Sequence, residues 1–518
     1  MKKLLLPLLG IAALFGAACD GARDVNQSVL NRGLSTDPES LDPHKARTVQ
    51  ALDVLRDIGE GLMSYTANGE LVAGTAQSWN VSADGRVWSF VIRENARWSN
   101  GDPVTAPHFE FSLKRLIDPQ TTSFYAQVLE EVVEAVEASD ERSLTIRLRQ
   151  ATPYFLDLLT HPSCFPVHVP SFEEHGDSFA RPGRLVSNGA YVLDTWIPGS
   201  ILILKRNVNY WNNAATAMDV VRHHVITQEV TELNRFRSGE LHMTSAVPPD
   251  GFSEMQQAFG EQLHIAPYLG VYYYGFNLTK PPFKDNPALR KALSMAIDRE
   301  VLVEKVLGRG ETAAYSWVPQ GTANYMPVSF SYADMQQNER NNIARGLYRQ
   351  AGYGDDKPLQ IELRFNTNDT HQRIALAVSA MWREVLGVET RLINEELQVF
   401  LANTRQREVT QVYKGSWIGD FNDAHTFLGV MQGGSPTNTP AYANDEYDSL
   451  VKRAASQTDP GRRRLYLEEA ERVLLADHPV IPLYFYVSKH LVSDEVRGWG
   501  DNVLDYHYSQ HLSLGAAE

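Results

Sequence analysis

The chain has 518 residues, of which 21% are charged and 43% hydrophobic, and its formal net charge is −15 at pH 7. This composition is that of a folded globular protein, and the acidic balance argues against a nucleic-acid partner and for solubility. The length predicts about three domains or subdomains.

The amino terminus has the three parts of a secretory signal. Lys2 and Lys3 precede an apolar run over residues 4–15, and small residues follow it. The run is shorter than the roughly 18 apolar residues that a membrane span needs. We therefore predict a signal peptide over residues 1–18 and export of the mature chain.

Cys19 follows the small residues directly, as in the lipobox of bacterial lipoproteins, although Gly16 stands where that motif usually has Leu. We expect Cys19 to be lipidated and residues 19–31 to form a tether. Cys164 is then the only other cysteine, so we predict no internal disulfide and interpret Cys164 as a small buried apolar residue.

Strand and hairpin patterns dominate the first half of the chain. Leucine and isoleucine spacing predicts a helix over residues 51–62. Alternating apolar residues and turn signals predict strands over residues 79–81, 87–92, 132–138, 144–149, 191–196, 201–206 and 271–277.

Helices and strands alternate in the second half. Asn286 and Pro287 have the pattern of a helix start, and Asp459 and Pro460 have the same pattern before a last long helix that reaches about residue 476. An apolar strand follows over residues 480–487.

Residues 359–393 form a strand, helix, strand unit with the helix ending at Gly387, which predicts a crossover within a parallel sheet. The predicted fold class is α/β with more than one lobe.

Residues 414–428 hold the strongest functional signal. They follow a predicted strand over residues 410–413 and precede a Gly-, Pro- and Asn-rich run, so we expect a loop. Trp417 offers a flat apolar face, Gly415 allows close backbone approach, and Asp420 supplies an anion. This set suits a ligand with an exposed backbone and a positive end, as a peptide has.

A structural interpretation of the same residues stands beside this one. Trp417 can be a core residue, Asp420 and Asp423 can be solvated turn residues, and Gly415 and Gly419 can serve only the turn.

Two other classes of function have weaker support. The hydrolase motifs G-x-S-x-G and H-E-x-x-H do not occur in the sequence. For a metal carrier, His161 with His168 or the pair His223 and His224 are candidate ligands. Adjacent residues on a strand point to opposite faces, however, so His223 and His224 do not make one site.

Several motifs in order resemble the extracellular solute-binding proteins of bacterial peptide ABC importers, and the oligopeptide-binding proteins most closely. The resemblance covers residues 41–487. Its motifs are S-L-D-P-H-K (40–45), G-T-A-Q-S-W-N-V-S-A-D-G-R-V-W-S-F-V-I-R (74–93), R-W-S-N-G-D-P-V-T-A (97–106), N-G-A-Y-V-L (188–193), R-N-V-N-Y-W (206–211), P-P-F-K-D-N-P-A-L-R-K-A-L-S-M-A-I-D-R (281–299), F-N-T-N-D-T-H (365–371) and S-W-I-G-D-F-N-D (416–423).

The resemblance implies a two-lobed periplasmic-binding-protein fold of the hinged, class II type, with a small subdomain inserted in the first lobe. Lobe I would comprise residues 32–59, 187–271 and 490–518, the inserted subdomain residues 60–186, and lobe II residues 272–489. Ligand would be enclosed between the lobes by hinge closure.

The implied function is that of the substrate-binding component of an ABC importer, which captures short peptides and delivers them to a membrane permease. Such a protein is a periplasmic monomer, held to the membrane by its lipid, and has neither catalytic activity nor a cofactor or metal. The alternatives are a metal or haem carrier of the same fold and a peptide-binding sensor that is not coupled to transport.

The resemblance also implies site residues. Asp420 matches the acid that pairs with the α-amino group of the peptide. Trp417 and the backbone around Gly415 match the edge that hydrogen-bonds an extended peptide. The remaining matches are a pocket-lining tyrosine, Tyr125, and three basic residues that can meet the peptide carboxylate, Arg405, Lys414 and His371.

Arg47 and Val49 complete the predicted peptide-binding set. Arg47 stands where the family has a glutamate, and Leu397 stands where it has a tryptophan, so acidic peptides or another register are expected. The structural alternatives are that Arg405 and Lys414 are surface cations and that His371 caps its helix.

Overall fold

The computed structural model of the protein describes residues 27–515. The predicted signal peptide, Cys19 and most of the predicted tether lie outside the described residues. Three larger sheets, each with its own hydrophobic core, organise the chain.

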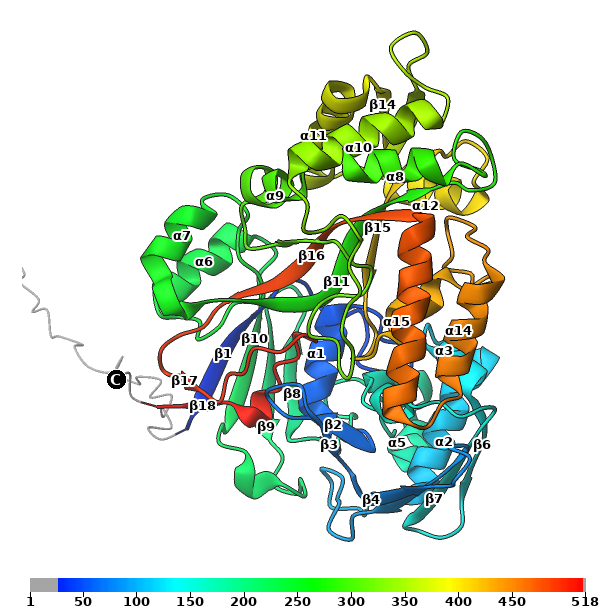
Figure 1. Cartoon of the computed structure of the whole chain (residues 1–518). Helices are drawn as coiled ribbons and strands as arrows, with labels where there is room; N and C mark the ends of the chain where they lie inside the picture. Colours follow the sequence, from blue (N-terminus) through cyan, green and yellow to red (C-terminus); the bar gives the residue numbers. More distant parts are fainter. Residues whose placement is uncertain (1–26, 516–518) are drawn as a thin grey trace, which may run out of the picture.

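The first sheet lies at the lower left of Figure 1, with strand order β1-β10-β9-β8. β1 pairs parallel with β10 and the other pairs are antiparallel. Its elements and their neighbours are β1 (Val29–Leu34), α1 (Val49–Ile58), β8 (Tyr191–Ile197), β9 (Ile201–Arg206), β10 (Val220–Val225), α6 (Glu229–Arg237), α7 (Phe252–Phe259), β17 (Val496–Arg497) and β18 (Ser513–Leu514).

The second sheet is antiparallel, with order β4-β5-β7-β6, and lies at the bottom of Figure 1. It falls within the predicted inserted subdomain, whose exact boundaries stay a prediction. The elements of this region are β2 (Met63–Tyr65), β3 (Leu71–Ala73), β4 (Ala76–Val81), β5 (Val87–Ile92), α2 (Ala106–Ile117), α3 (Ala126–Val132), β6 (Val133–Ala138), β7 (Ser143–Leu148), α4 (Phe155–Leu158) and α5 (Val169–His175).

The third sheet is mixed and has the order β12-β16-β11-β15-β13-β14. Helices α8, α10 and α11 gather above it in Figure 1, and α14 and α15 lie at the right. Its strands and helices are β11 (Leu263–Phe276), α8 (Pro287–Met295), α9 (Arg299–Val301), β12 (Thr312–Ala313), α10 (Gln337–Gln350), β13 (Gln360–Asn366), α11 (Asp369–Leu386), β14 (Glu389–Glu395), α12 (Leu397–Gln406), β15 (Val412–Ile418), α13 (His425–Leu428), α14 (Asp445–Ala455), α15 (Pro460–Asp477) and β16 (Val480–Leu491).

The helix boundaries confirm the predicted capping signals. The side chain of Asn286 accepts a hydrogen bond from the backbone N–H of Leu289, and Asp459 caps α15 in the same way. Gly387 ends α11 with φ +71°, in the left-handed region that favours glycine. β13 and β14 pair in parallel on either side of α11, which confirms the predicted crossover.

Two long strands join two of the hydrophobic cores. β11 and β16 run side by side through the middle of Figure 1. Leu263 of β11 packs in a core with α6 and α7, whereas Val271 packs in the core of the third sheet. The β11–β16 register shifts between Pro267 and Val271, so the irregular part of the ladder lies where the two cores meet.

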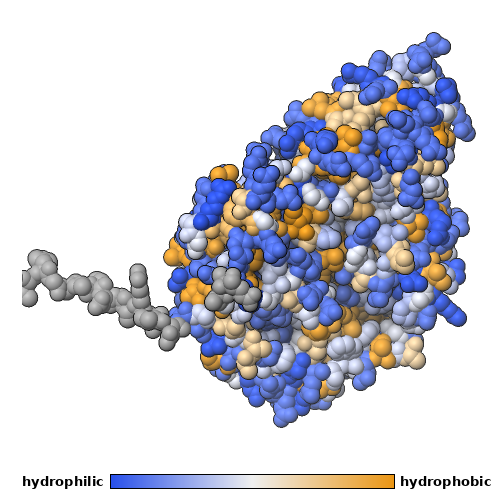
Figure 2. Space-filling view, turned by 60° about the vertical axis from the view of Figure 1, so that its left-hand side comes forward, coloured by the Kyte–Doolittle hydropathy of each residue, from blue (hydrophilic) through white to orange (hydrophobic). Residues whose placement is uncertain are grey.

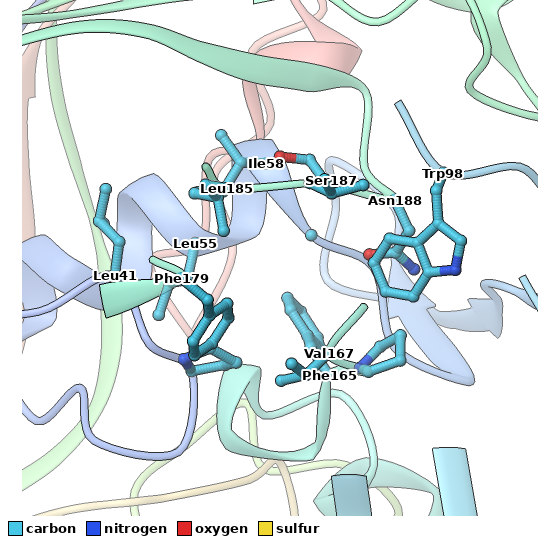
Figure 3. Close-up of a pocket in the computed structure, with 14 residues that line it drawn as sticks. Leu41, Leu55, Ile58, Trp98, Phe165, Val167, Phe179, Leu185, Ser187 and Asn188 are labelled. Carbon is cyan, nitrogen blue, oxygen red and sulfur yellow. The ribbon is translucent and has the colours of Figure 1, made fainter. Parts of the chain in front are cut away.

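A second connection joins the residues just after α1 to those just before β8, where the predicted boundaries of the first lobe lie. Asn188 Nδ2 donates to the carbonyl oxygen of Glu60 (2.8 Å), and the Glu60 N–H donates back to Asn188 Oδ1 (3.0 Å). Figure 3 shows the adjoining cavity, where Leu55 and Ile58 of α1 lie opposite Phe165. The cavity measures about 30 Å³, room for a single water molecule.

No helix among residues 27–515 is long and apolar enough to cross a membrane. Polar and apolar residues are mixed over the face shown in Figure 2, and the apolar ones lie in several separate groups.

Tyr273 and Gly415 set the packing of β15 against β11. A Cβ atom on Gly415 would lie 2.2 Å from Cζ of Tyr273, because the tyrosine ring lies across the glycine. The tyrosine ring packs edge to face against Trp317, with ring centroids 5.0 Å apart. The backbone N–H of Trp317 in turn donates to the buried carboxylate of Glu471 (2.7 Å). Packing therefore accounts for this glycine.

We predict that Gly415→Ala destabilises the protein by roughly 1–3 kcal/mol, because the added methyl group would overlap the buried ring of Tyr273. Thermal or urea unfolding measures the change. Gly346→Ala is the matched control: it lies within α10 with nothing near its missing Cβ, and should be neutral or stabilising by up to about 1 kcal/mol. Equal stability of Gly415→Ala and the wild type would contradict this packing.

Candidate functional site

The predicted loop at residues 414–428 begins later than expected. β15 extends to Ile418, so Lys414 to Ile418 are strand residues, and the loop starts at Gly419. Pairing with β11 over the full length of β15 holds this segment extended, although the run K-G-S-W-I has no clear strand pattern. The prediction of a loop at Lys414 was wrong for this reason.

One edge of β15 pairs with a neighbouring strand over only part of its length. β11 pairs with β15 from Val412 to Ile418, but β13 pairs only with Val412 and Tyr413. Within residues 27–515, no strand pairs with that second edge further along β15.

The residues that present this free edge follow from the ladder. Gly419 N–H donates to the Leu269 carbonyl oxygen of β11 (2.8 Å). Backbone groups alternate in direction along a strand, so Gly415 and Trp417 also point toward β11. The backbone groups of Ser416 and Ile418 point the other way. The resemblance places the backbone contact with a peptide around Gly415. The ladder instead leaves the backbone groups of Ser416 and Ile418 free for such a contact.

Asp420 lies just beyond this edge. Its side chain is exposed to solvent, and it has no hydrogen-bond or ion-pair partner in the described part of the chain. Desolvation by surrounding protein nevertheless raises the pKa of Asp420 to about 6. Neighbouring protein groups thus desolvate this carboxylate although it reaches solvent, and a cationic group could pair with it there.

The loop after Asp420 is firmly anchored. Asp423 forms two hydrogen bonds with Arg463 of α15 (2.6 and 2.7 Å), and both side chains are buried. Phe421 stacks on Tyr154 of the second-sheet region, with ring centroids 4.6 Å apart. Asp423 is therefore a buried structural residue, not a solvated turn residue, and its ion pair helps to fix the position of Asp420.

Tyrosines from two other parts of the chain lie near Asp420. Burial raises the pKa of Tyr125 and that of Tyr506, and the negative charge of Asp420 raises both further. Tyr125 stacks on His161, with centroids 4.1 Å apart, and its hydroxyl has no hydrogen-bond partner among the described residues. Tyr506 belongs to the carboxyl-terminal segment, which carries no motif, so the sequence could not single it out.

Trp417 is half-buried against the core of the third sheet. Its indole N–H is buried and, in the part of the chain that the structure describes, has no acceptor. Buried donors are normally paired, so a ligand that accepts from Trp417 and Tyr125 would supply the partners that these two donors lack.

A basic and aromatic group lies at the other end of the free edge. Lys414 Nζ lies 5.5 Å from the centroid of the Tyr272 ring, and His371 Nδ1 lies 3.3 Å from the Tyr272 hydroxyl. Burial lowers the pKa of Lys414 to about 8 and that of His371 to about 4. Lys414 is thus mostly charged at neutral pH and His371 is neutral. The helix cap is Asn368, not the ring of His371.

The structure does not bring the other predicted residues into this group. Arg405 is exposed in the last turn of α12, eight residues or about 12 Å along the axis from Leu397. Arg47 and Val49 are exposed at the start of α1. None of them contacts Asp420 or Trp417 among the described residues, so their roles stay predictions.

The candidate metal ligands are engaged elsewhere. His223 contacts Asp57 (3.1 Å) and His224 contacts Asn31 (3.0 Å), so the two rings point to different neighbours, as predicted. His168 contacts Asp102 (3.0 Å). Cys164 is buried and forms no disulfide within residues 27–515, which confirms its interpretation as a small core residue.

Comparison with known proteins agrees with this geometry. Residues 70–439 match the family described as bacterial extracellular solute-binding proteins, family 5 Middle. The periplasmic oligopeptide-binding protein OppA of Escherichia coli (strain K12) is 36% identical over 525 residues, which cover 98% of this chain and 96% of OppA.

Solved structures are similar over nearly the whole chain. The periplasmic murein tripeptide-binding protein MppA in its unliganded open form has a TM-score of 0.85 at 34% identity, covering 94% of this chain and 97% of MppA. Haemophilus influenzae OppA in complex with RPPGFSPFR has a TM-score of 0.76 at 32% identity, covering 94% and 99% of the two chains. This protein belongs to the bacterial extracellular solute-binding proteins, family 5, and has their two-lobed periplasmic-binding fold.

Proposed function

We propose that this protein captures short peptides between its lobes and delivers them to the permease of an ABC importer. The observation that carries the proposal is the free edge of β15, which ends at Asp420, a carboxylate without a partner among residues 27–515. OppA of E. coli, which is named as a periplasmic oligopeptide-binding protein, supports it.

The ligand would add to the sheet as a further strand. Ser416 and Ile418 would hydrogen-bond its backbone, and Asp420 would pair with its α-ammonium group. Main-chain pairing is independent of side chains, so it would bind many sequences.

The other end of the ligand would lie near Lys414. Ile418 and Lys414 are four residues apart, about 13 Å along an extended strand, which is the span of about four peptide residues. The charged Lys414 would meet the terminal carboxylate, with the neutral His371 beside it as a hydrogen-bonding group. Arg405, Arg47 and Val49 would line more distant parts of the site.

The protein would act in the periplasm as a monomer without chemical activity of its own. OppA and MppA of E. coli are named as periplasmic proteins, which supports this location. A lipid on Cys19 would hold it at the membrane.

We predict that peptide affinity depends on the ionisation of Asp420. An α-ammonium group favours the ionised carboxylate, so affinity should be full above about pH 6 and fall up to tenfold per unit as the pH drops below it. His371, with a pKa of about 4, stays neutral between pH 5 and 7. Titration calorimetry with a tetrapeptide at pH 5 to 7.5 measures this profile.

Asp420→Asn tests the assignment in the same assay. Loss of a charged hydrogen bond, roughly 1.5–3 kcal/mol, should weaken binding about 10- to 100-fold at pH 7.5 and flatten the profile between pH 5 and 7. Glu384→Gln, an exposed carboxyl change on α11, is the control and should behave as the wild type. An unchanged affinity or profile in Asp420→Asn would remove Asp420 from the site.

A second prediction concerns the backbone edge. Ser416→Pro removes the N–H group that we assign to the peptide and should weaken binding roughly 3- to 10-fold. Proline is tolerated where a strand N–H has no ladder partner, so stability should change little. Ser416→Ala, which loses the same hydroxyl but keeps the N–H, should bind normally. Equal affinities of the two variants would show that this N–H does not contact the ligand.

A further inference from the structure

Three potential metal ligands converge on one point outside the peptide site. His490 is near the end of β16, and Asp505 and His507 lie in the carboxyl-terminal segment. Nε2 of His490 lies 2.9 Å from Asp505 Oδ1, and Nε2 of His507 lies 3.0 Å from the same oxygen. The three ligand atoms lie within 4.8 Å of one another.

A contact with the backbone fixes the orientation of the His490 ring. Its Nδ1 lies 2.9 Å from the carbonyl oxygen of Thr244, and a carbonyl can only accept a hydrogen bond. Nδ1 therefore carries a proton, and Nε2 is the atom that can bind a metal ion. Metal-ligating histidines typically have such a second contact, because it fixes the tautomer and the ring orientation.

His507 and Asp505 are also held in place. The His507 ring stacks on Trp499, with centroids 3.7 Å apart and planes at 14°. Asp505 has φ +58°, a left-handed backbone conformation that few residues adopt. Both its hydrogen bonds use Oδ1, and Oδ2 has no partner among the described residues. The side chain of Asp505 is 25% exposed, so an ion and a water ligand have access to it.

We propose that His490, Asp505 and His507 bind one divalent transition-metal ion, with Zn²⁺ as the best match. Two imidazoles and a carboxylate are the ligands of zinc and its neighbours, with water as the fourth ligand, whereas calcium and magnesium prefer oxygen alone. The ion joins the carboxyl-terminal segment to β16 and thereby fixes Tyr506, which lies between two of its ligands and close to Asp420.

The charges around the cluster also allow an arrangement of the three side chains without a metal ion. Arg32 donates to the His507 carbonyl oxygen (2.9 Å) and opposes a cation, although Asp57 lies 3.7 Å from Arg32 and partly neutralises it. Without an ion, the same three side chains form a cluster in which a protonated His490 pairs with Asp505. Metal binding distinguishes the two arrangements.

The test uses tag-free mature protein that has been stripped with EDTA. Zn²⁺ alone is titrated by calorimetry, and Co²⁺ is added separately as a spectroscopic probe whose visible bands report the ligand geometry. We expect one ion per chain, with affinity lowered at least tenfold in His507→Gln and in Asp505→Asn. His175→Gln, a change of a partly exposed histidine in α5, is the matched control and should bind as the wild type.

Circular dichroism and thermal unfolding establish that each variant is folded. If Asp505→Asn does not fold, the zinc affinity of His507→Gln is the deciding measurement. The cobalt spectrum of the wild type tests the ligand geometry without the use of a variant. Absence of saturable Zn²⁺ binding by the wild type, or wild-type affinity in His507→Gln, would overturn the proposal in favour of the protonated cluster.

Discussion

The proposed site depends on a difference between the two edges of β15: one is paired along its whole length and the other at only two residues. β11 holds one edge from Val412 to Ile418, and β13 leaves the other edge after Tyr413. An exposed edge of this kind is a template for another strand. A short segment that ends at an anion limits what can pair there to an extended chain with a positive end.

The surroundings of β15 fix the position of this edge. The ring of Tyr273 fills the space above Gly415, and the Asp423–Arg463 ion pair anchors the loop that carries Asp420. Tyr125, from the second-sheet region, and Tyr506, from the carboxyl-terminal segment, are the groups that other parts of the chain bring near Asp420. The proposed ligand contacts thus come from segments that β11 and β16 join across the irregular part of their ladder.

Much of the fold could be predicted because its signals are local. The caps at Asn286, Asp459 and Gly387, and the crossover through α11, depend on neighbouring residues. The strand at Lys414 was missed because its conformation is imposed by β11, about 140 residues away in sequence.

The site was predictable only in part for the same reason. Asp420 and Trp417 stand in a recognisable motif. Tyr506, by contrast, reaches the site through long-range packing. The free backbone groups of Ser416 and Ile418 depend on strand register, which the sequence does not specify by itself.

Peptide capture is the central claim, and native mass spectrometry of the mature protein as purified tests it most directly. The bound material is released by denaturation and sequenced. We predict a mixture of short peptides that share a length of about four residues but no common sequence. A bound metal, haem or sugar, or an empty protein that also fails to bind a library of tri- to pentapeptides, would contradict the account and leave only the two-lobed fold.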